Sequence, residues 1–540
     1  MKLIVVGGVA AGASAAVKAR RTTENCEIVI YEKGANISYA NCGMPYFIGG
    51  TIKERDELLV VTKEYLKRRF NIEVRCNSLV KELLPQKKKI VIEDVLTGNI
   101  YEDCYDKLII ATGAEPITPP SLQGDKVFQL YTLSDMDRIK EFIQKERPKR
   151  ALIMGAGFIG IEMAENFQHL NMEVFIVEKA PQILLPFDPE MAKLVEEYLK
   201  KQGINVVTGV GVSKIEDDRA YLENGDVIKF DIALSSLGVK PNSSLAKNAG
   251  IECGLRGAIK VNEFMETSIK DIYACGDVAE NFYRINNEVC WIPLAGSANK
   301  QGRIAGFNAV CSGEKKSYKG TLGTAIAKFH SIVFGATGFN EKQLVEKGIS
   351  FTSHYLTSEH HAGYYPGGQP LYIKLLGDTK GKLLGAQVVG FEGVDKRVDV
   401  FATSIYSGLT FDDLESLDLA YAPPFSSAKD PVIVAGMIGN NIVKGEVKTL
   451  SKLPENITDF VLLDVRTKVE NKVGALKGAV NIPIDEIRKR VHELEAYKDK
   501  KIIVYCASGY RSYIVTKFLQ NSGFKEIFNL SGGYFFNGKR

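Results

Sequence analysis

The stretch Lys2-Leu3-Ile4-Val5-Val6-Gly7-Gly8-Val9-Ala10-Ala11-Gly12 decides the fold of the first part of this chain. Its apolar run predicts a buried strand, its glycines predict a tight turn, and the alanine-rich residues beyond them predict a helix. A second strand is expected over residues 26–31, and it ends at Glu32. Such a turn presents backbone N–H groups and a helix N-terminus to a pyrophosphate, while an acidic residue ~20 positions later binds ribose hydroxyls.

We therefore predict a dinucleotide site, with a bare structural turn as the alternative because Val9 replaces the middle glycine of GxGxxG. The residues predicted to contact this first dinucleotide are Gly7, Ala10, Ala11, Gly12, Glu32 and Lys33.

The same unit recurs with a complete fingerprint. Residues 150–154 predict a strand, Gly155-Ala156-Gly157-Phe158-Ile159-Gly160 is the turn, and the next strand ends at Glu178. Two fingerprints imply two dinucleotides. Because an acidic residue here accepts hydrogen bonds from a free 2′-hydroxyl and repels a 2′-phosphate, we expect NADH, although Lys179 leaves NADPH use open. The predicted contacts are Gly155, Gly157, Phe158, Ile159, Gly160 and Glu178.

Two further strand ends carry cofactor-type motifs. Ala111-Thr112-Gly113 follows one apolar strand, and Gly276-Asp277 follows another, where the carboxylate and nearby amides can meet a ribityl or phosphate group. The order of these motifs resembles the pyridine nucleotide–disulfide oxidoreductase family from residue 1 to about 445. The resemblance implies FAD in the first fold, NAD(P)H in the second, and electrons that pass from nicotinamide to flavin and then to Cys42. It also implies that Ala295 and Asn299 contact the cofactor.

Cys42 stands in Ser38-Tyr39-Ala40-Asn41-Cys42-Gly43-Met44-Pro45, and no second cysteine follows it. A redox-active Cys42 must therefore form its mixed disulfide or persulfide with a sulfur from outside its own loop. Relatives that reduce peroxide or oxygen carry a histidine in the first glycine turn, where this chain has Ala10, and no histidine precedes His169. The chain instead resembles the coenzyme A disulfide reductase branch, including its rhodanese fusions that act as NADH-dependent persulfide reductases.

That branch implies further site residues. Coenzyme A would be bound by Arg21, Ser38, Asn41 and Lys429, as cations for the phosphates and polar groups for the pantetheine amides. Two tyrosines from the partner subunit of a homodimer would complete the site: Tyr421, and Tyr365 with Tyr364 as the alternative. A phenol there can protonate a leaving thiolate or polarise a disulfide.

The pattern of alternating strands and helices restarts after Gly445 and resembles rhodanese. Its loop, Cys506-Ala507-Ser508-Gly509-Tyr510-Arg511, lies between a strand and a helix, where loop amides and the helix dipole favour an anionic sulfur. The six-residue span is one residue shorter than the loop of related cysteine phosphatases, so it favours sulfur transfer. Cys506 is the predicted nucleophile, and Arg511 either pairs with an anionic donor or fixes the loop.

The predicted fold class is α/β: two Rossmann-like domains, an α+β dimerisation domain and a C-terminal α/β rhodanese domain. The expected parts are an FAD-binding domain (1–115 and 250–320), an NAD(P)H-binding domain (116–249), a dimerisation domain (321–445), a linker (446–458) and a rhodanese domain (459–540).

Composition limits the alternatives. The 540 residues carry a formal net charge of only +4, which does not suggest nucleic acid, and no apolar run is long enough to cross a membrane. The nine cysteines lack the spacing of a disulfide framework or of a metal site, so we expect no metal and a reducing cytoplasm.

We predict an NADH-dependent, FAD-containing reductase of persulfides or polysulfides, with coenzyme A persulfide as the model substrate and with sulfide and a thiol as products. One alternative is a coenzyme A disulfide reductase that maintains thiol balance. An alternative of another class is a flavin-gated sulfur carrier or redox sensor.

Overall fold

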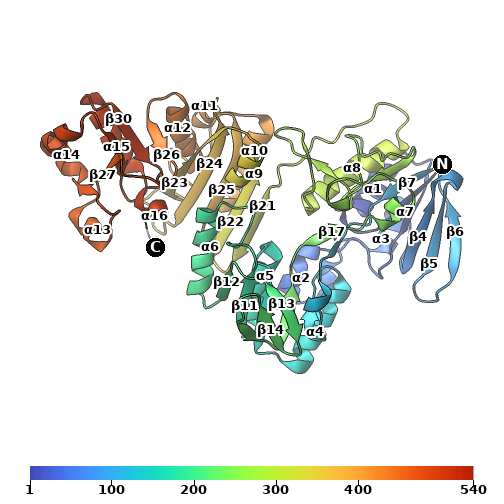
Figure 1. Cartoon of the computed structure of the whole chain (residues 1–540). Helices are drawn as coiled ribbons and strands as arrows, with labels where there is room; N and C mark the ends of the chain where they lie inside the picture. The colour runs from blue at the N-terminus through green and yellow to red at the C-terminus, as the bar shows by residue number, and fades with distance from the viewer. Residues whose placement is uncertain (539–540) are drawn as a thin grey trace. The chain divides into compact units, whose positions relative to one another are not determined.

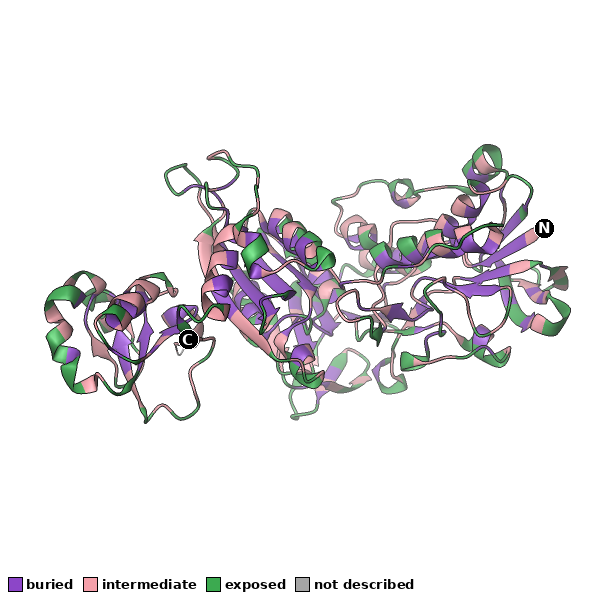
Figure 2. Ribbon diagram, turned by 90° about the horizontal axis from the view of Figure 1, so that it is seen from above, coloured by how far each residue is buried: buried purple, intermediate pink, exposed green. Residues whose placement is uncertain are grey.

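The computed structural model describes residues 1–538. The chain divides into two compact units. The first comprises Met1–Leu184 and Leu199–Gly323, and the second comprises Leu185–Tyr198 and Thr324–Arg540. Purple, the colour of buried residues, is concentrated on the strands in Figure 2, as expected when apolar strands supply the core.

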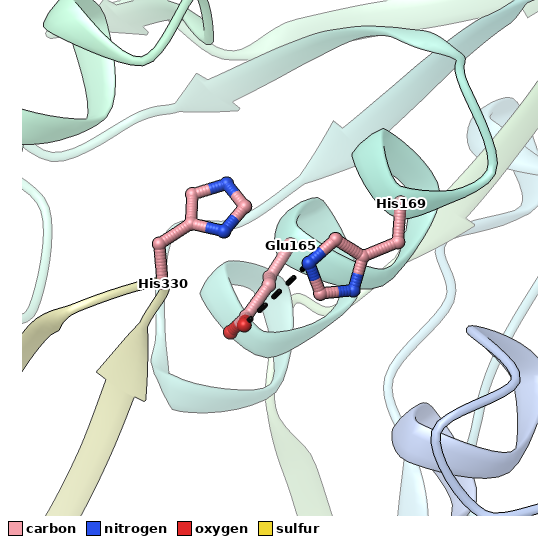
Figure 3. A group of neighbouring side chains, drawn as sticks. All are labelled: Glu165, His169 and His330. Carbon is pink, nitrogen blue, oxygen red and sulfur yellow. Dashed lines mark ion pairs between the residues drawn. The ribbon is translucent and has the colours of Figure 1, made fainter.

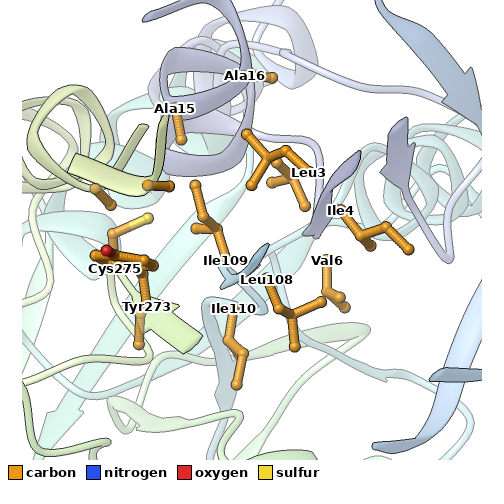
Figure 4. Packing of buried hydrophobic residues seen from close by; sticks show 14 of the residues in the cluster. Leu3, Ile4, Val6, Ala15, Ala16, Leu108, Ile109, Ile110, Tyr273 and Cys275 are labelled. Carbon is orange, nitrogen blue, oxygen red and sulfur yellow. The ribbon is translucent and has the colours of Figure 1, made fainter. Parts of the chain in front are cut away.

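A parallel sheet in the first unit has the order β18-β7-β1-β2-β3. Its strands are β1 (Lys2–Val6), β2 (Glu27–Tyr31), β3 (Glu73–Arg75), β7 (Lys107–Ile110) and β18 (Ile272–Ala274). Apolar side chains from these strands pack with alanines of α1 (Ala10–Arg20), and Figure 4 shows Leu3, Ile109 and Ala15 among them. Helix α8 (Ala295–Val310) packs against α1. The sheet brings the first glycine turn and the ends of β7 and β18 to one edge, where α/β proteins bind ligands.

A second parallel sheet in the same unit has the order β12-β11-β10-β16-β9. Its strands are β9 (Val127–Phe128), β10 (Arg150–Met154), β11 (Glu173–Glu178), β12 (Asn205–Thr208) and β16 (Ile232–Ser235). Helix α5 (Phe158–His169) follows the second glycine turn, and α4 (Leu133–Glu146) begins with a capping box between Thr132 and Asp135. Four smaller antiparallel sheets complete the described part of this unit. One of them consists of β4 (Ser78–Leu84), β5 (Lys89–Asp94) and β6 (Ile100–Cys104) (Figure 1).

The second unit contains an antiparallel sheet with the order β21-β22-β25-β24-β23. Its strands are β21 (Ala325–Phe329), β22 (Ile332–Gly338), β23 (Phe351–Glu359), β24 (Pro370–Asp378) and β25 (Leu383–Gly390). Helix α10 (Val394–Ser407) packs on β22 and β25 (Figure 1). A segment without regular structure runs from residue 416 to α12 (Pro431–Val443), as its proline and serine content predicts.

A parallel sheet with the order β26-β30-β29-β27-β28 closes the chain. Its strands are β26 (Lys448–Leu450), β27 (Phe460–Asp464), β28 (Val480–Asn481), β29 (Lys501–Tyr505) and β30 (Glu526–Leu530). Part of the predicted linker differs from expectation: Lys448–Leu450 pairs in parallel with Phe528–Leu530. Strand β30 pairs with β29 on one side only, so the backbone groups on its other side would be unpaired without this short segment.

Two further observations concern the described residues as a whole. All nine cysteines are free thiols. None of the helices between residues 1 and 538 combines the length and the apolar character that a membrane crossing requires.

Candidate active site

The first glycine turn forces its backbone segments into close contact. Gly7 has a φ of +99°, a conformation that side chains with a Cβ rarely adopt. A Cβ on Gly12 would lie 1.8 Å from the carbonyl oxygen of Gly7. Helix α1 starts at Ala10 with no acidic residue in its first turn. The turn therefore offers the positive end of a helix to an anion, as a bound pyrophosphate requires.

Glu32 is oriented by the same turn. Its carboxylate accepts hydrogen bonds from the backbone N–H of Gly8 and of Gly34, both at 2.8 Å. These two bonds hold a nearly buried carboxylate beside the glycine turn and leave acceptor capacity for ribose hydroxyls. Lys33 is exposed next to it.

The second turn repeats this arrangement. A Cβ on Gly160 would lie 2.2 Å from the carbonyl oxygen of Gly155. Glu178 accepts from the N–H groups of Ala156 and Ala180, both at 2.8 Å. Lys179 forms a 2.7 Å ion pair with Glu223. We had expected the charge of Lys179 to weaken the preference for NADH, but this charge is paired with a carboxylate.

The other predicted cofactor residues lie at strand and helix ends. Ala111, Thr112 and Gly113 follow β7, and the Thr112 hydroxyl donates to the carbonyl of Asn242 at 2.7 Å. Ala295 begins α8, and Asn299, one turn further, accepts from the Ser14 hydroxyl at 2.5 Å. Asn299 thus has a partner from α1.

Asp277 is half-buried and follows β18. Burial raises its pKa to about 6, and a hydrogen bond with Tyr131 opposes this effect. The adjacent Gly276 has a φ of +79° and donates its N–H to the side chain of Gln301 at 2.8 Å. A desolvated carboxyl group with capacity for further hydrogen bonds suits the hydroxyls of a ribityl chain. Together with the first glycine turn, this carboxyl fits FAD.

Cys42 lies in a short 3₁₀ turn, Asn41–Gly43, that leads into α2 (Met44–Ile48). The residue as a whole is exposed, yet protein atoms crowd its thiol. This burial raises the pKa of the Cys42 thiol, and the carboxyl groups of Glu162 and Asp277 raise it further. The protein alone therefore favours the thiol form, and the predicted thiolate needs a stabilising partner from outside the chain.

Two groups near Cys42 were not predicted from the sequence. Burial raises the pKa of Glu162 to about 7, and its Oε1 accepts a long hydrogen bond, 3.4 Å, from the Tyr46 hydroxyl. Burial and Glu162 raise the pKa of Tyr46 to about 12. Tyr46 could have been found from its spacing, because it lies one helical turn beyond Cys42. Glu162 had no such signal, because it lies in the helix after the second glycine turn.

The first histidine of the chain lies away from the glycine turns. His169 ends α5, and its Nε2 lies 4.0 Å from Oε1 of Glu165 one turn earlier (Figure 3). The histidine expected in peroxide-reducing relatives therefore has no counterpart in the first turn, where Ala10 opens α1.

Two of the predicted coenzyme A residues of the first unit, Asn41 and Arg21, contact neighbouring residues of that unit. Ser38 has a φ of +46°, and Asn41 donates its side-chain amide to the carbonyl of Tyr131 at 2.9 Å. Arg21 follows the last residue of α1 as its C-cap, and its guanidinium lies over the ring of Phe70. The pKa of Lys18, one turn earlier, is lowered by burial and then by the positive charges of Lys316, Arg303 and Arg21. These four cations form a basic cluster suited to phosphate groups.

The predicted phenols lie in the second unit. The hydroxyls of Tyr364 and Tyr421 are 2.8 Å apart, whereas the ring of Tyr365 packs edge-on against His361 with centroids 5.4 Å apart. The geometry thus pairs Tyr364, which we had kept as the alternative, with Tyr421. Lys429 is exposed in the loop that follows Tyr421.

Cys506 follows β29 and faces the N-terminus of α15 (Tyr510–Asn521). Its Sγ accepts from the N–H of Gly509 at 3.0 Å and from the hydroxyl of Ser512 at 3.5 Å. Arg511 forms a two-fold ion pair with Glu470, at 2.9 and 2.6 Å, and this guanidinium lowers the pKa of Glu470 to about 2. This ion pair favours the second of the two roles considered for Arg511, that of fixing the loop. No motif or spacing in the sequence predicted that Glu470, 41 residues away, would pair with Arg511.

Comparison with known proteins agrees with this arrangement. Residues 1–302 match the family described as "Pyridine nucleotide-disulphide oxidoreductase", 324–432 match its dimerisation domain, and 446–535 match a rhodanese-like domain. The chain is 36% identical to a NADH oxidase of Methanocaldococcus jannaschii and 33% identical to a coenzyme A disulfide reductase of Staphylococcus haemolyticus. Each alignment covers 81% of this chain and 98% of the relative.

Two solved structures resemble the whole chain. Reduced Bacillus anthracis CoADR-RHD superposes with a TM-score of 0.96 at 42% identity, over 99% of this chain and 97% of the other. An NAD-dependent persulfide reductase from A. fulgidus superposes with a TM-score of 0.91 at 36% identity, over 99% of this chain and 100% of the other.

Paired dinucleotide folds, a lone cysteine and a rhodanese-type loop define a flavoprotein oxidoreductase that handles sulfur. The chain belongs to the pyridine nucleotide-disulphide oxidoreductase family. Its cofactors are FAD and NAD(H), and the predicted α/β fold with a dimerisation domain and a C-terminal rhodanese domain is confirmed.

Proposed function

We propose that this protein uses NADH to reduce coenzyme A persulfide and polysulfides at Cys42, and that its rhodanese domain handles sulfane sulfur at Cys506. The observation that carries the proposal is a lone free Cys42 on a dinucleotide-binding chain that ends in a second lone cysteine loop. The similarity of the whole chain to an NAD-dependent persulfide reductase supports it.

The chemistry begins with a Cys42 thiolate that attacks the sulfur bonded to coenzyme A, so that hydrosulfide leaves and a mixed disulfide forms. When bound, NADH and FAD supply the two electrons that split this disulfide. The coenzyme A thiolate then leaves and takes a proton from a tyrosine hydroxyl. The basic cluster of Lys18, Arg21, Arg303 and Lys316 binds the phosphates of coenzyme A.

The phenols belong to a homodimeric arrangement in this proposal. Tyr364 and Tyr421 of one subunit serve Cys42 of the partner subunit, and the dimerisation domain supports this assembly. Ser38, Asn41 and Lys429 contact the pantetheine arm and phosphates. The predicted domain limits and a cytoplasmic location belong to the same proposal, and nine free cysteines support a reducing compartment.

In the rhodanese domain, Cys506 accepts a sulfane sulfur from a donor as a persulfide. The Gly509 N–H and the Ser512 hydroxyl, which already contact Sγ, stabilise the anionic sulfur. The Arg511–Glu470 ion pair fixes the loop that presents these donors.

The test is steady-state NADH oxidation by the flavin-loaded protein with coenzyme A persulfide, coenzyme A disulfide and polysulfide. We expect the persulfide and polysulfide to be turned over fastest, with stoichiometric sulfide release. Cys42→Ser should abolish turnover, whereas Cys104→Ser, at another exposed cysteine, should not change it. No change in Cys506→Ser with any persulfide or polysulfide would remove the proposed coupling to the rhodanese domain.

The second candidate is coenzyme A disulfide reduction. The 33% identity to a coenzyme A disulfide reductase over 436 residues, which make up 81% of this chain, favours it. A faster rate with the disulfide than with the persulfide would assign the protein to thiol redox maintenance.

A further inference from the structure

Two separate loops of the second unit carry the phenols, and one buried arginine lies beneath both. Arg397 is on α10 and is only 1% exposed. Its guanidinium donates to the carbonyl of His360 at 2.8 Å, at the start of the loop that holds Tyr364. The same nitrogen donates to Asp430 at 2.9 Å, at the end of the loop that holds Tyr421.

Asp430 connects this arginine to the second loop. Its Oδ2 accepts from the hydroxyl of Ser426 at 2.6 Å, and its Oδ1 accepts from the N–H of Val432 at the start of α12. Burial opposes the charge of this carboxylate, but these hydrogen bonds and the charge of Arg397 lower its pKa. Asp430 is therefore an anionic anchor for residues 426–432.

The first loop is closed at the same point. His360 and Gln369 exchange hydrogen bonds of 3.0 and 3.1 Å across its base. Arg397 also donates to the carbonyl of Gly393 at 3.2 Å, which joins the guanidinium to the start of its own helix. Arg397 thus ties the bases of both loops to α10.

The phenols themselves have little packing to hold them. Tyr364 is 75% exposed and Tyr421 is 48% exposed, yet their hydroxyls meet at 2.8 Å across 57 residues of chain. An exposed contact of this kind persists only if the loops beneath it keep their spacing, because side-chain entropy opposes the contact. The spacing is provided by the buried group that bonds both loops.

We propose that Arg397 is a positioning residue that keeps the hydroxyls of Tyr364 and Tyr421 in contact for protonation of the leaving thiolate. The proposal rests on the role assigned to the two phenols under the proposed function. Lysine cannot replace Arg397 in this role. The planar guanidinium reaches Gly393 with one nitrogen and His360 and Asp430 with another, whereas all the donors of an ammonium lie on a single nitrogen.

The test compares Arg397→Lys with the parent holoenzyme in two measurements. The first is photo-oxidative coupling of adjacent phenols, with the Tyr364–Tyr421 dityrosine peptide quantified by mass spectrometry. The second is kcat in the parent and in a Tyr364→Phe/Tyr421→Phe background. The matched control is Arg55→Lys, which alters another two-fold Arg–Asp pair, with Asp137 at 2.8 Å.

We expect Arg397→Lys to lower the dityrosine yield several-fold and kcat by ~10- to 100-fold, the cost of a displacement of about 1 Å at a reacting group. In the double phenylalanine background the same substitution should have no further effect on kcat. Arg55→Lys should leave both measurements unchanged. Ser426→Ala, which keeps the ion pair but removes one bond to Asp430, should give an intermediate yield and serves if Arg397→Lys does not fold.

An unchanged dityrosine yield in Arg397→Lys would overturn the proposal, and so would an equal loss of kcat in both backgrounds. Full turnover by the double phenylalanine variant would instead refute the role of the phenols in the proposed function. In that case the cross-linking yield still decides whether Arg397 keeps their hydroxyls in contact.

Discussion

Replacement of Lys374 by methionine should destabilise the second unit more than any loss of a surface charge. The ammonium of Lys374 is fully buried and lies 2.8 Å from a carboxylate oxygen of Asp188 and of Glu341. It also pairs with Glu190, which accepts a hydrogen bond from the Tyr355 hydroxyl as well. Methionine keeps the length of the side chain but leaves three carboxyl groups without their shared cation.

The magnitude follows from the remaining partners. Removal of one member of a buried ion pair costs about 3–5 kcal/mol of unfolding free energy. Asp188 would keep its bond from Gln387 at 2.7 Å, and Glu341 would keep its ion pair with Lys452 at 2.8 Å. We therefore expect a loss near the lower limit, ~3 kcal/mol, which corresponds to a fall in Tm of roughly 6–12 °C for a unit of this size.

The loss should depend on pH. Burial opposes ionisation of Glu341, but Lys374 outweighs it and lowers the pKa to about 2. A lowered folded-state pKa contributes stability that is complete above the ordinary value and disappears as the pH falls toward 2. Without the ammonium, burial raises the pKa of these carboxyl groups. As the pH falls they become protonated, and the variant no longer bears the cost of burying unpaired negative charges. The difference in Tm should therefore be larger at pH 8 than at pH 5.

The assay is differential scanning calorimetry of parent and variant at both pH values. The control is Lys444→Met, which removes an exposed ion pair with Asp412 in the same unit and should hardly change the Tm, because water screens such a pair. If Lys374→Met lowers the Tm no more than Lys444→Met does, or lowers it more at pH 5 than at pH 8, the electrostatic reasoning is refuted.

Three other substitutions test the sites directly. Gly12→Val should abolish flavin retention, because even a Cβ at this position would lie 1.8 Å from a backbone oxygen. The measurement is the ratio of flavin to protein absorbance. The control Gly313→Val, where a Cβ meets open space, should retain the flavin. Glu178→Ser should raise the ratio of NADPH to NADH efficiency by ~10-fold or more, and an unchanged ratio would contradict the assignment. Glu162→Gln should accelerate iodoacetamide labelling of Cys42 at pH 8, where a carboxyl group with a pKa of about 7 is ionised, but hardly at pH 6. Equal acceleration at both pH values would show that charge is not the cause.

The sequence alone determined the dinucleotide folds and the position of two lone cysteines in separate loops. A glycine turn between a strand and a helix uses residues that are adjacent in the chain, so its motif predicts its geometry. The same holds for the Cys506 loop, whose Gly509 N–H reaches a sulfur three residues away. The absence of a second cysteine beside Cys42 is also a local property.

Only the tertiary structure decided the pairings between distant residues. Tyr364 rather than Tyr365 meets Tyr421, because the base of each loop is bonded to a helix that lies between them in sequence. Arg511 meets Glu470 because β27 and β29 are neighbours in the sheet. Side chains at such separations meet only after strands and helices have packed, and no periodicity or motif in the chain encodes that contact.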